Sequence, residues 1–237
     1  MKAVGIVGYK RSGKTTLVIR LSQEFSRMGH RVAILKHVSD SIGFPDTDTS
    51  KFRSYVPLVS AISSVETEII LKGKKRIEDI LKYFDSDLVL IEGFKKEKTF
   101  PKIVCINEEK DKSKLFDGLE IATAGFDKDI VDFDISNDEH IKKLTLVVAK
   151  KSFKLPDLNC GHCGYESCFG LAKEIVKGKK SITNCVSLNP PISIKVDGAE
   201  FPLNPFMSNL FKNSFSAMLS SLKGFKKGRI EIEIPYE

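Results

Sequence analysis

The chain has 237 residues, 41% apolar and 29% charged, which is typical of a folded protein large enough for one sizeable α/β domain and something smaller. No apolar run approaches the roughly 20 residues that a helix needs to cross a bilayer, and the first residues predict a strand rather than a signal peptide, so we expect the cytoplasm and no membrane partner. The net charge of +7 comes mostly from lysines scattered along the chain beyond one short cluster at 72–76, so we expect no nucleic-acid partner.

The first 28 residues predict a strand, a loop and a helix. Residues 3–7 form a β-rich apolar run typical of a strand buried in a parallel sheet. After the loop, apolar residues recur at steps of three and four from Leu17 to Met28, which predicts an amphipathic helix that Gly29 ends. The loop between them, GYKRSGKTT at 8–16, has the spacing of a phosphate-binding P-loop. We therefore expect an α/β fold of the P-loop NTPase type, with a mostly parallel sheet flanked by helices.

The residue types of this loop suit phosphate binding. Gly8 and Gly13 let the backbone curl so that successive N–H groups and the start of the helix point at phosphates. Lys14 is expected to reach the β and γ oxygens of a nucleotide, and the hydroxyl of Thr15 to bind Mg²⁺. The predicted nucleotide-binding set is Gly8, Lys10, Arg11, Ser12, Gly13, Lys14, Thr15 and Thr16.

The next segments predict residues beside the same site. Residues 31–35 predict a second buried strand that ends in Lys36 and His37, which we expect to face the P-loop crevice as possible switch or substrate residues. Residues 39–56 predict a long switch-like loop in which Asp48 holds magnesium directly or through water. A hairpin around 65–67 and a short helix at 77–84 follow.

A further apolar strand ends in a carboxylate. Residues 87–93, DLVLIEG, deliver Glu92 to the strand's carboxyl end, where the magnesium side of a P-loop site needs an anionic acceptor. Strands are predicted at 102–107, with Cys105 as a small core residue, at 121–125 and at 130–134. Ser136 and Glu139 have the spacing of a capping box for a helix that ends near Lys151.

Residues 1 to about 150 resemble the molybdopterin-guanine dinucleotide biosynthesis protein B family. The matching motifs are SGKTTL at 12–17, Lys36-His37, DTS at 48–50 followed by Phe52-Arg53, and IEGFK at 91–95. The resemblance implies a GTP-binding P-loop adaptor, at most a slow GTPase, that assists a molybdopterin guanylyltransferase. No N-K-x-D signature for guanine is present, and no water-positioning glutamine or arginine finger is evident, although Lys10 or Arg11 could assist in a homodimer.

Four of the five cysteines are crowded into one segment, which predicts a metal site and not a disulfide framework. Cys160, Cys163, Cys168 and Cys185 suit either zinc or an iron–sulfur cluster. Their spacing lacks the two tight knuckles usual for zinc. Glycines 161, 164 and 170 would let backbone N–H groups approach inorganic sulfides, which favours a 4Fe-4S cluster.

The cysteine segment resembles the small 4Fe-4S module of the corrinoid iron–sulfur protein and of the electron-transport complex B subunit. We expect three parts: a nucleotide-binding domain at 1–152, a cluster module at 153–189 and a small α/β tail at 190–237. The tail predicts a hairpin at 192–201, a helix at 204–222 and a strand at 229–234.

These features support one main hypothesis and two rivals. The main one is a nucleotide-binding protein of the molybdenum or tungsten cofactor pathway that uses GTP, Mg²⁺ and a 4Fe-4S cluster, with the guanylyltransferase and a redox enzyme or metalloenzyme as partners. The rivals are a nucleotide-dependent electron-transfer protein and a metallochaperone-like GTPase acting on a metalloenzyme.

Overall fold

The computed structural model describes residues 2–39, 42, 47–190, 192–196, 199–201, 203, 205–226, 228 and 230. Six strands form its main sheet: β1 (Lys2–Gly8), β2 (Val32–Lys36), β5 (Leu88–Glu92), β6 (Lys102–Cys105), β7 (Glu120–Gly125) and β8 (Phe133–Asp134). Their order is β2-β5-β1-β6-β7-β8, and every neighbouring pair is parallel. The predicted α/β fold with a parallel sheet is confirmed, although β8 is shorter than the predicted strand at 130–134.

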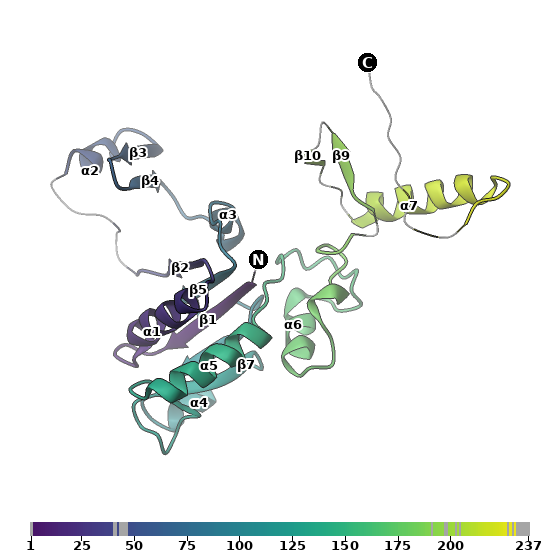
Figure 1. Ribbon diagram of the computed structural model, residues 1–237. Coiled ribbons are helices and arrows are strands. Elements are labelled where there is room, and N and C mark those ends of the chain that lie inside the picture. The colour runs from purple at the N-terminus through teal and green to yellow at the C-terminus, as the bar shows by residue number, and fades with distance from the viewer. Residues whose placement is uncertain are drawn as a thin grey trace.

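Helices cover both faces of this sheet, as Figure 1 shows. The helices α1 (Lys14–Arg27) and α5 (Asp138–Lys151) lie side by side on one face, and α3 (Ile77–Leu81) and α4 (Lys110–Leu115) pack on the other. Side chains alternate between the faces along a strand. In β1, Val4 and Ile6 accordingly pack in the α1–α5 core, whereas Ala3 and Val7 pack in the cores that contain α3 and α4.

The strand β2 differs from its prediction. It was expected to be buried, but it forms the edge of the sheet next to β5, and Ile34 is half exposed. An apolar run alone does not distinguish an inner strand from an edge strand, because both need one apolar face.

The segment after β2 leaves the sheet and returns at α3. Where a long loop was predicted, it contains the short helix α2 (Asp48–Phe52), which Thr47 caps by accepting a hydrogen bond from the Ser50 N–H at 3.2 Å. The strands β3 (Leu58–Ile62) and β4 (Thr67–Leu71) then form the predicted antiparallel hairpin. Figure 1 shows α2 and this hairpin standing away from the sheet.

The start of α5 corrects the predicted capping box. The helix is capped by Asn137, whose Oδ1 accepts hydrogen bonds from the N–H groups of Glu139 and His140 at 2.9 and 3.3 Å. The Ser136 hydroxyl instead donates to Asp134 at 2.5 Å. The capping role therefore falls one residue later than the Ser-x-x-Glu spacing indicated.

The cysteine segment folds around α6 (Cys168–Val176) and a 3₁₀ turn, η1 (Ile182–Asn184). Its apolar cluster joins side chains of this segment to Leu119, which immediately precedes β7. The buried members are Leu119, Phe153, Leu155, Cys168, Leu171, Ala172 and Cys185. This cluster packs the cysteine segment against the α/β part.

The last part holds the hairpin of β9 (Ile194–Val196) and β10 (Ala199–Phe201) and the helix α7 (Pro205–Ser220). Both elements agree with their predictions, whereas most of the strand predicted at 229–234 lies outside the described residues. Within the described part of the chain, no helix is both long and apolar enough to cross a membrane.

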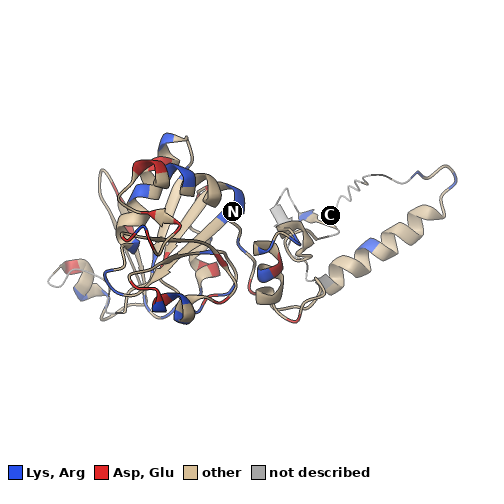
Figure 2. Cartoon of the chain, turned by 90° about the horizontal axis from the view of Figure 1, so that it is seen from below, with Lys and Arg blue, Asp and Glu red and all other residues tan. Residues whose placement is uncertain are grey.

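A buried ion-pair network lies between β6 and the turn before β7. The side chain of Lys102 is fully buried, and its Nζ lies 2.6 Å from Asp117 Oδ2 and 2.8 Å from the Lys95 carbonyl oxygen. Lys98 also pairs with Asp117, at 2.5 Å, and its ammonium lies 4.7 Å from the ring centre of Phe169 in α6. Elsewhere basic and acidic residues are interspersed over the α/β part (Figure 2).

Candidate functional site

The P-loop folds as a closed turn between β1 and α1. Gly13 has φ +81°, a conformation that favours glycine, and its N-cap position begins the helix. Gly8 is needed for a different reason, because a Cβ there would come within 2.4 Å of the Ser12 hydroxyl and 2.6 Å of the Cys105 carbonyl oxygen. Both glycines of the motif are therefore explained by the local backbone.

The side chain of Lys14 folds back over this loop. Its Nζ lies 2.5 Å from the Tyr9 carbonyl oxygen and 3.5 Å from the Ser12 hydroxyl. The ammonium is therefore held above the loop's own backbone. Lys10 and Arg11 are exposed, and Arg11 has φ +63°.

The Glu92 carboxylate lies beside the loop, where the ends of β2 and β5 meet the start of α1. The hydroxyl of Thr15 donates to Glu92, with Oγ1 3.1 Å from Oε1, and the Lys36 Nζ lies 3.6 Å from the same oxygen. The parallel register explains the meeting, because Ile6 of β1 and Lys36 of β2 both pair with Glu92 of β5. Glu92 is only 7% exposed, so its charge lies in a protected position beside the first turn of α1.

His37 lies directly beside the backbone of Glu92. Its backbone N–H donates to the Glu92 carbonyl at 2.9 Å, and its ring contacts Phe94 edge-on with centroids 4.9 Å apart. A Cβ at Gly93, where φ is +93°, would lie 2.9 Å from the His37 Cβ. Gly93 therefore allows the chain to turn away past His37 directly after the carboxylate.

Asp48 is not brought to this group. It lies in α2, away from the sheet (Figure 1), and its carboxylate pairs with Lys51 at 3.1 Å. The side chain is 79% exposed. In this conformation Thr15 and Glu92 meet without it.

A cavity of about 250 Å³ opens over the P-loop. Its lining consists of consecutive loop and helix residues and one aromatic ring from the end of β7: Arg11, Ser12, Gly13, Lys14, Thr15, Thr16 and Phe126. Phe126 was not singled out in the sequence. The available signal was its position directly after the apolar run 121–125, at the sheet edge that carries the P-loop.

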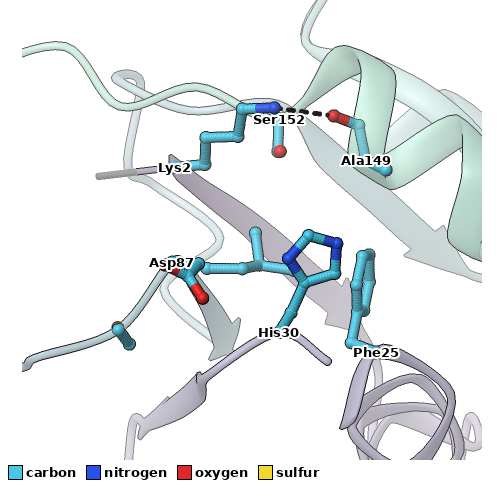
Figure 3. Close-up of a pocket in the computed structure, with 8 residues that line it drawn as sticks. Lys2, Phe25, His30, Asp87, Ala149 and Ser152 are labelled. Atoms are coloured by element: carbon cyan, nitrogen blue, oxygen red, sulfur yellow. Dashed lines mark hydrogen bonds between the residues drawn. The ribbon is translucent and has the colours of Figure 1, made fainter. Parts of the chain in front are cut away.

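A second cavity, of about 310 Å³, lies at the opposite edge of the sheet (Figure 3). Lys2 and Leu88, which begin β1 and β5, line it together with His30. The Lys2 ammonium donates to the Ala149 carbonyl at the end of α5, at 2.9 Å. Because ligands of parallel sheets bind beyond the carboxyl ends of strands, this amino edge is the less favourable one for a nucleotide.

The four clustered cysteines gather around the start of α6. Cys163, Cys168 and Cys185 belong to one apolar cluster, and the Cys160 Sγ lies 3.4 Å from the hydroxyl of Ser187, two residues after Cys185. The Asn159 side chain accepts a hydrogen bond from the Cys168 N–H at 2.8 Å, which ties the first cysteine loop to the helix. All five cysteines of the chain are free thiols.

The thiols differ in their electrostatic surroundings. Hydrogen bonds from the Ser187 hydroxyl and the His162 backbone lower the pKa of Cys160 to about 7. Burial raises the pKa of Cys185, and its neighbours Cys168 and Cys163 raise it further. Burial also raises the pKa of Cys105, inside β6, to about 12, as expected of a core thiol.

The donor set fits an iron–sulfur cluster. Its four thiols are the ligand type that such clusters take. Among the described residues, no group of three or more His, Cys, Asp or Glu side chains is arranged so that it could hold a metal ion. Gly161 has φ +73°, and no atom lies within 4 Å of the position that a Cβ would take there. Gly170 lies in α6, where a Cβ would come within 3.3 Å of the Tyr165 side chain. The approach of its N–H group to a sulfide stays a prediction.

Two families of known proteins match the chain. Residues 3–124 match the family described as molybdopterin guanine dinucleotide synthesis protein B, and residues 155–187 match one described as "Putative Fe-S cluster".

A Methanocaldococcus jannaschii protein named "Putative molybdopterin-guanine dinucleotide biosynthesis adapter protein" is 31% identical over 245 residues, which cover 99% of this chain and 98% of that relative. A Bacillus subtilis protein named "Probable molybdopterin-guanine dinucleotide biosynthesis adapter protein" is 30% identical over 117 residues, covering 46% of this chain and 66% of the relative. The crystal structure of Bacillus subtilis MobB shares the fold, with a TM-score of 0.52 and 20% identity over 62% of this chain and 98% of that one.

Proposed function

Because the chain belongs to the molybdopterin guanine dinucleotide synthesis protein B (MobB) family, we propose that it is a GTP-binding adapter in molybdopterin-guanine dinucleotide biosynthesis. It binds GTP with Mg²⁺, hydrolyses it slowly and assists a molybdopterin guanylyltransferase in the cytoplasm. The adapter names of the two relatives support the pathway, and the relative from Methanocaldococcus jannaschii does so over the whole length of the chain.

One observation supports the nucleotide site most directly. The Thr15 hydroxyl already contacts the protected Glu92 carboxylate beside the P-loop, at 3.1 Å. A hydroxyl at this position of a P-loop is a magnesium ligand, and a strand-end carboxylate accepts hydrogen bonds from the ion's waters. We assign phosphate binding to the predicted set, namely Gly8, Lys10, Arg11, Ser12, Gly13, Lys14, Thr15 and Thr16.

The residues that line the cavity support the proposal of slow hydrolysis. Its described lining, Arg11–Thr16 and Phe126, includes no carboxylate or glutamine that could orient an attacking water. Lys10 and Arg11 are exposed, so in a homodimer a second copy could receive them. Lys36, whose Nζ lies 3.6 Å from Glu92, and its neighbour His37 are the proposed switch or substrate residues.

Calorimetric titration with GTP and Mg²⁺ tests this proposal. Lys14→Ala is expected to abolish measurable binding, because the ammonium that neutralises the β and γ oxygens is lost. Lys143→Ala is the matched control, since it removes the same charge from the exposed surface of α5. Equal affinity of Lys14→Ala and the wild type would refute the proposed site.

The cysteine segment is proposed to hold a 4Fe-4S cluster on Cys160, Cys163, Cys168 and Cys185. When bound, such a cluster supplies one-electron redox chemistry or a structural cross-link. The chain's own residues arrange the thiols: Asn159 fixes the first loop to α6, and Ser187 holds the Cys160 sulfur. We take this module as 153–189, between a nucleotide-binding domain at 1–152 and a C-terminal tail at 190–237.

A second candidate function is nucleotide-dependent electron transfer or metal delivery to a metalloenzyme. It is favoured by the segment after Glu92, because the Lys95 ammonium lies 4.1 Å from the ring centre of Tyr9 in the P-loop and Lys98 lies over Phe169, next to Cys168. The same segment therefore contacts both sites. A cluster reduction potential that shifts when GTP is added would support this candidate, and an unchanged potential with faster guanylylation of molybdopterin would support the adapter.

A further inference from the structure

Phe126 is an exposed aromatic ring beside the P-loop that no part of the proposed phosphate or magnesium chemistry uses. It follows Gly125, the last residue of β7, at the same edge of the sheet as the loop. Phe126 is 56% exposed, although it lines the cavity over residues 11–16.

The ring contacts the phosphate loop with one edge. A Cβ at Gly13 would lie 3.0 Å from the Cε2 atom and 3.4 Å from the Cζ atom of Phe126. The Ile135 Cδ1 lies at 2.8 Å from the same position, so Gly13 is held between these two side chains. The exposed fraction of the ring therefore faces the cavity or the solvent beside it.

The sheet order indicates which end of a nucleotide would meet this ring. The strand β1, which leads into the P-loop, has β5 on one side and β6 followed by β7 on the other. Glu92, at the end of β5, marks the side of the magnesium ion and of the β- and γ-phosphates. Phe126, at the end of β7, lies on the other side of the loop and lines the same cavity, so a nucleotide whose phosphates lay beside Glu92 could extend its base toward this ring.

We propose that Phe126 is the platform on which the base of the bound nucleoside triphosphate stacks. This inference rests on the proposed nucleotide binding and adds the residue that holds the base. Aromatic rings stack on every base through its π face, so Phe126 contributes affinity for a purine and leaves discrimination between guanine and adenine to other groups.

The affinities of one variant for two ligands distinguish stacking of Phe126 on the base from a purely structural contact with the loop. Phe126→Leu keeps an apolar contact with Gly13 and removes the π face. Its affinity for GTP with Mg²⁺ should fall by about fivefold to a hundredfold, the range that stacking of one base contributes. Its affinity for inorganic tripolyphosphate with Mg²⁺ should equal that of the wild type.

Each other outcome overturns the proposal in a recognisable way. Unchanged GTP affinity in Phe126→Leu means that the ring does not touch the base. Equal losses for GTP and tripolyphosphate mean that the ring only supports the loop. A wild-type chain that binds neither ligand refutes nucleotide binding itself, and the inference with it.

A fluorescent reporter gives a second measurement that does not depend on affinity. The chain contains no tryptophan, so Phe126→Trp introduces a single indole at the position in question. GTP should quench its fluorescence by stacking, and tripolyphosphate should not. An emission spectrum that GTP leaves unchanged at saturating concentration would overturn the proposal.

Discussion

The hydroxyl of Thr15 donates to the carboxylate of Glu92, with Oγ1 3.1 Å from Oε1 and 3.3 Å from Oε2. The two residues are 77 positions apart in the sequence and meet because β1 and β5 are neighbours in parallel register. The proposed magnesium ligand and the proposed acceptor for the ion's waters are thus already adjacent in the folded chain.

Glu92→Gln is expected to weaken GTP binding only when Mg²⁺ is present. Glutamine keeps the length of the side chain and an oxygen for the Thr15 hydroxyl but removes the charge that fixes the ion's waters. Hydrogen bonds to charged groups contribute about 1.5–3 kcal/mol, so the loss should be about tenfold or more. Titrations with Mg²⁺ and with EDTA measure it, and the two proteins should bind alike in EDTA.

The control for this experiment is Asp48→Asn. Its carboxylate pairs with Lys51 on the exposed helix α2, so its removal should leave GTP affinity almost unchanged. An equally large loss in both variants would mean that α2 reaches the ion when nucleotide binds, as predicted for Asp48 from its place in a switch-like loop.

Replacing any one of Cys160, Cys163, Cys168 and Cys185 by serine is expected to reduce the iron and acid-labile sulfide recovered after anaerobic purification. Each thiolate would bind one iron, and a hydroxyl is a much poorer ligand. Cys105→Ala should keep the full iron and sulfide content, because this thiol is completely buried inside β6. Recovery of zinc in place of iron would contradict the cluster assignment.

Asp117→Asn is expected to destabilise the fold strongly. It removes the countercharge of Lys102, whose side chain is fully buried, and breaking one partner of a buried ion pair typically costs about 3–5 kcal/mol. Urea unfolding measures the change. Asp79→Asn, which breaks an exposed pair with Arg76, is the matched control and should move the unfolding midpoint little, so equal shifts would contradict a special role for Lys102.

The same carboxylate predicts an acid dependence of stability. Burial opposes ionisation of Asp117, but hydrogen bonds from Lys102 and Lys98 outweigh it and lower the pKa of Asp117 below the ordinary value of 3.8. A depressed folded-state pKa stabilises the fold above the ordinary pKa and loses this effect as the pH falls through the folded value. The stability gap between wild type and Asp117→Asn should therefore be constant from neutral pH down to about pH 5 and shrink below about pH 4. A gap that widens on acidification would contradict this assignment.

Sequence patterns were sufficient where local chemistry decides the structure. The strand, loop and helix around GYKRSGKTT follow from an apolar run, two glycines with different steric needs and one apolar stripe. They failed where a partner distant in sequence decides. Nothing local distinguishes β2 as an edge strand. The predicted cap of α5 failed for a local reason instead, because Asp134, two residues before Ser136, accepts from the Ser136 hydroxyl and Asn137 caps the helix.

The candidate site shows the same division. The meeting of Lys36 with Glu92 was foreseeable from strand ends that share one edge of a sheet. Phe126 was not, because a single aromatic after a strand has no motif and is recognisable only once β7 is known to lie on the far side of β1 from β5. Lys102 was likewise hidden, since its partner Asp117 is 15 positions away and a lysine in a strand is usually solvated.

Leu119 is completely buried, and the side chains around it include Phe153, Leu155 and Leu171, all of which come after residue 152. A fragment that ends at residue 152 would lack these side chains. Leu119, directly before β7, would then be exposed to solvent. We therefore expect a fragment that ends at residue 152 to be less stable than the whole chain, because it loses the burial of this side chain.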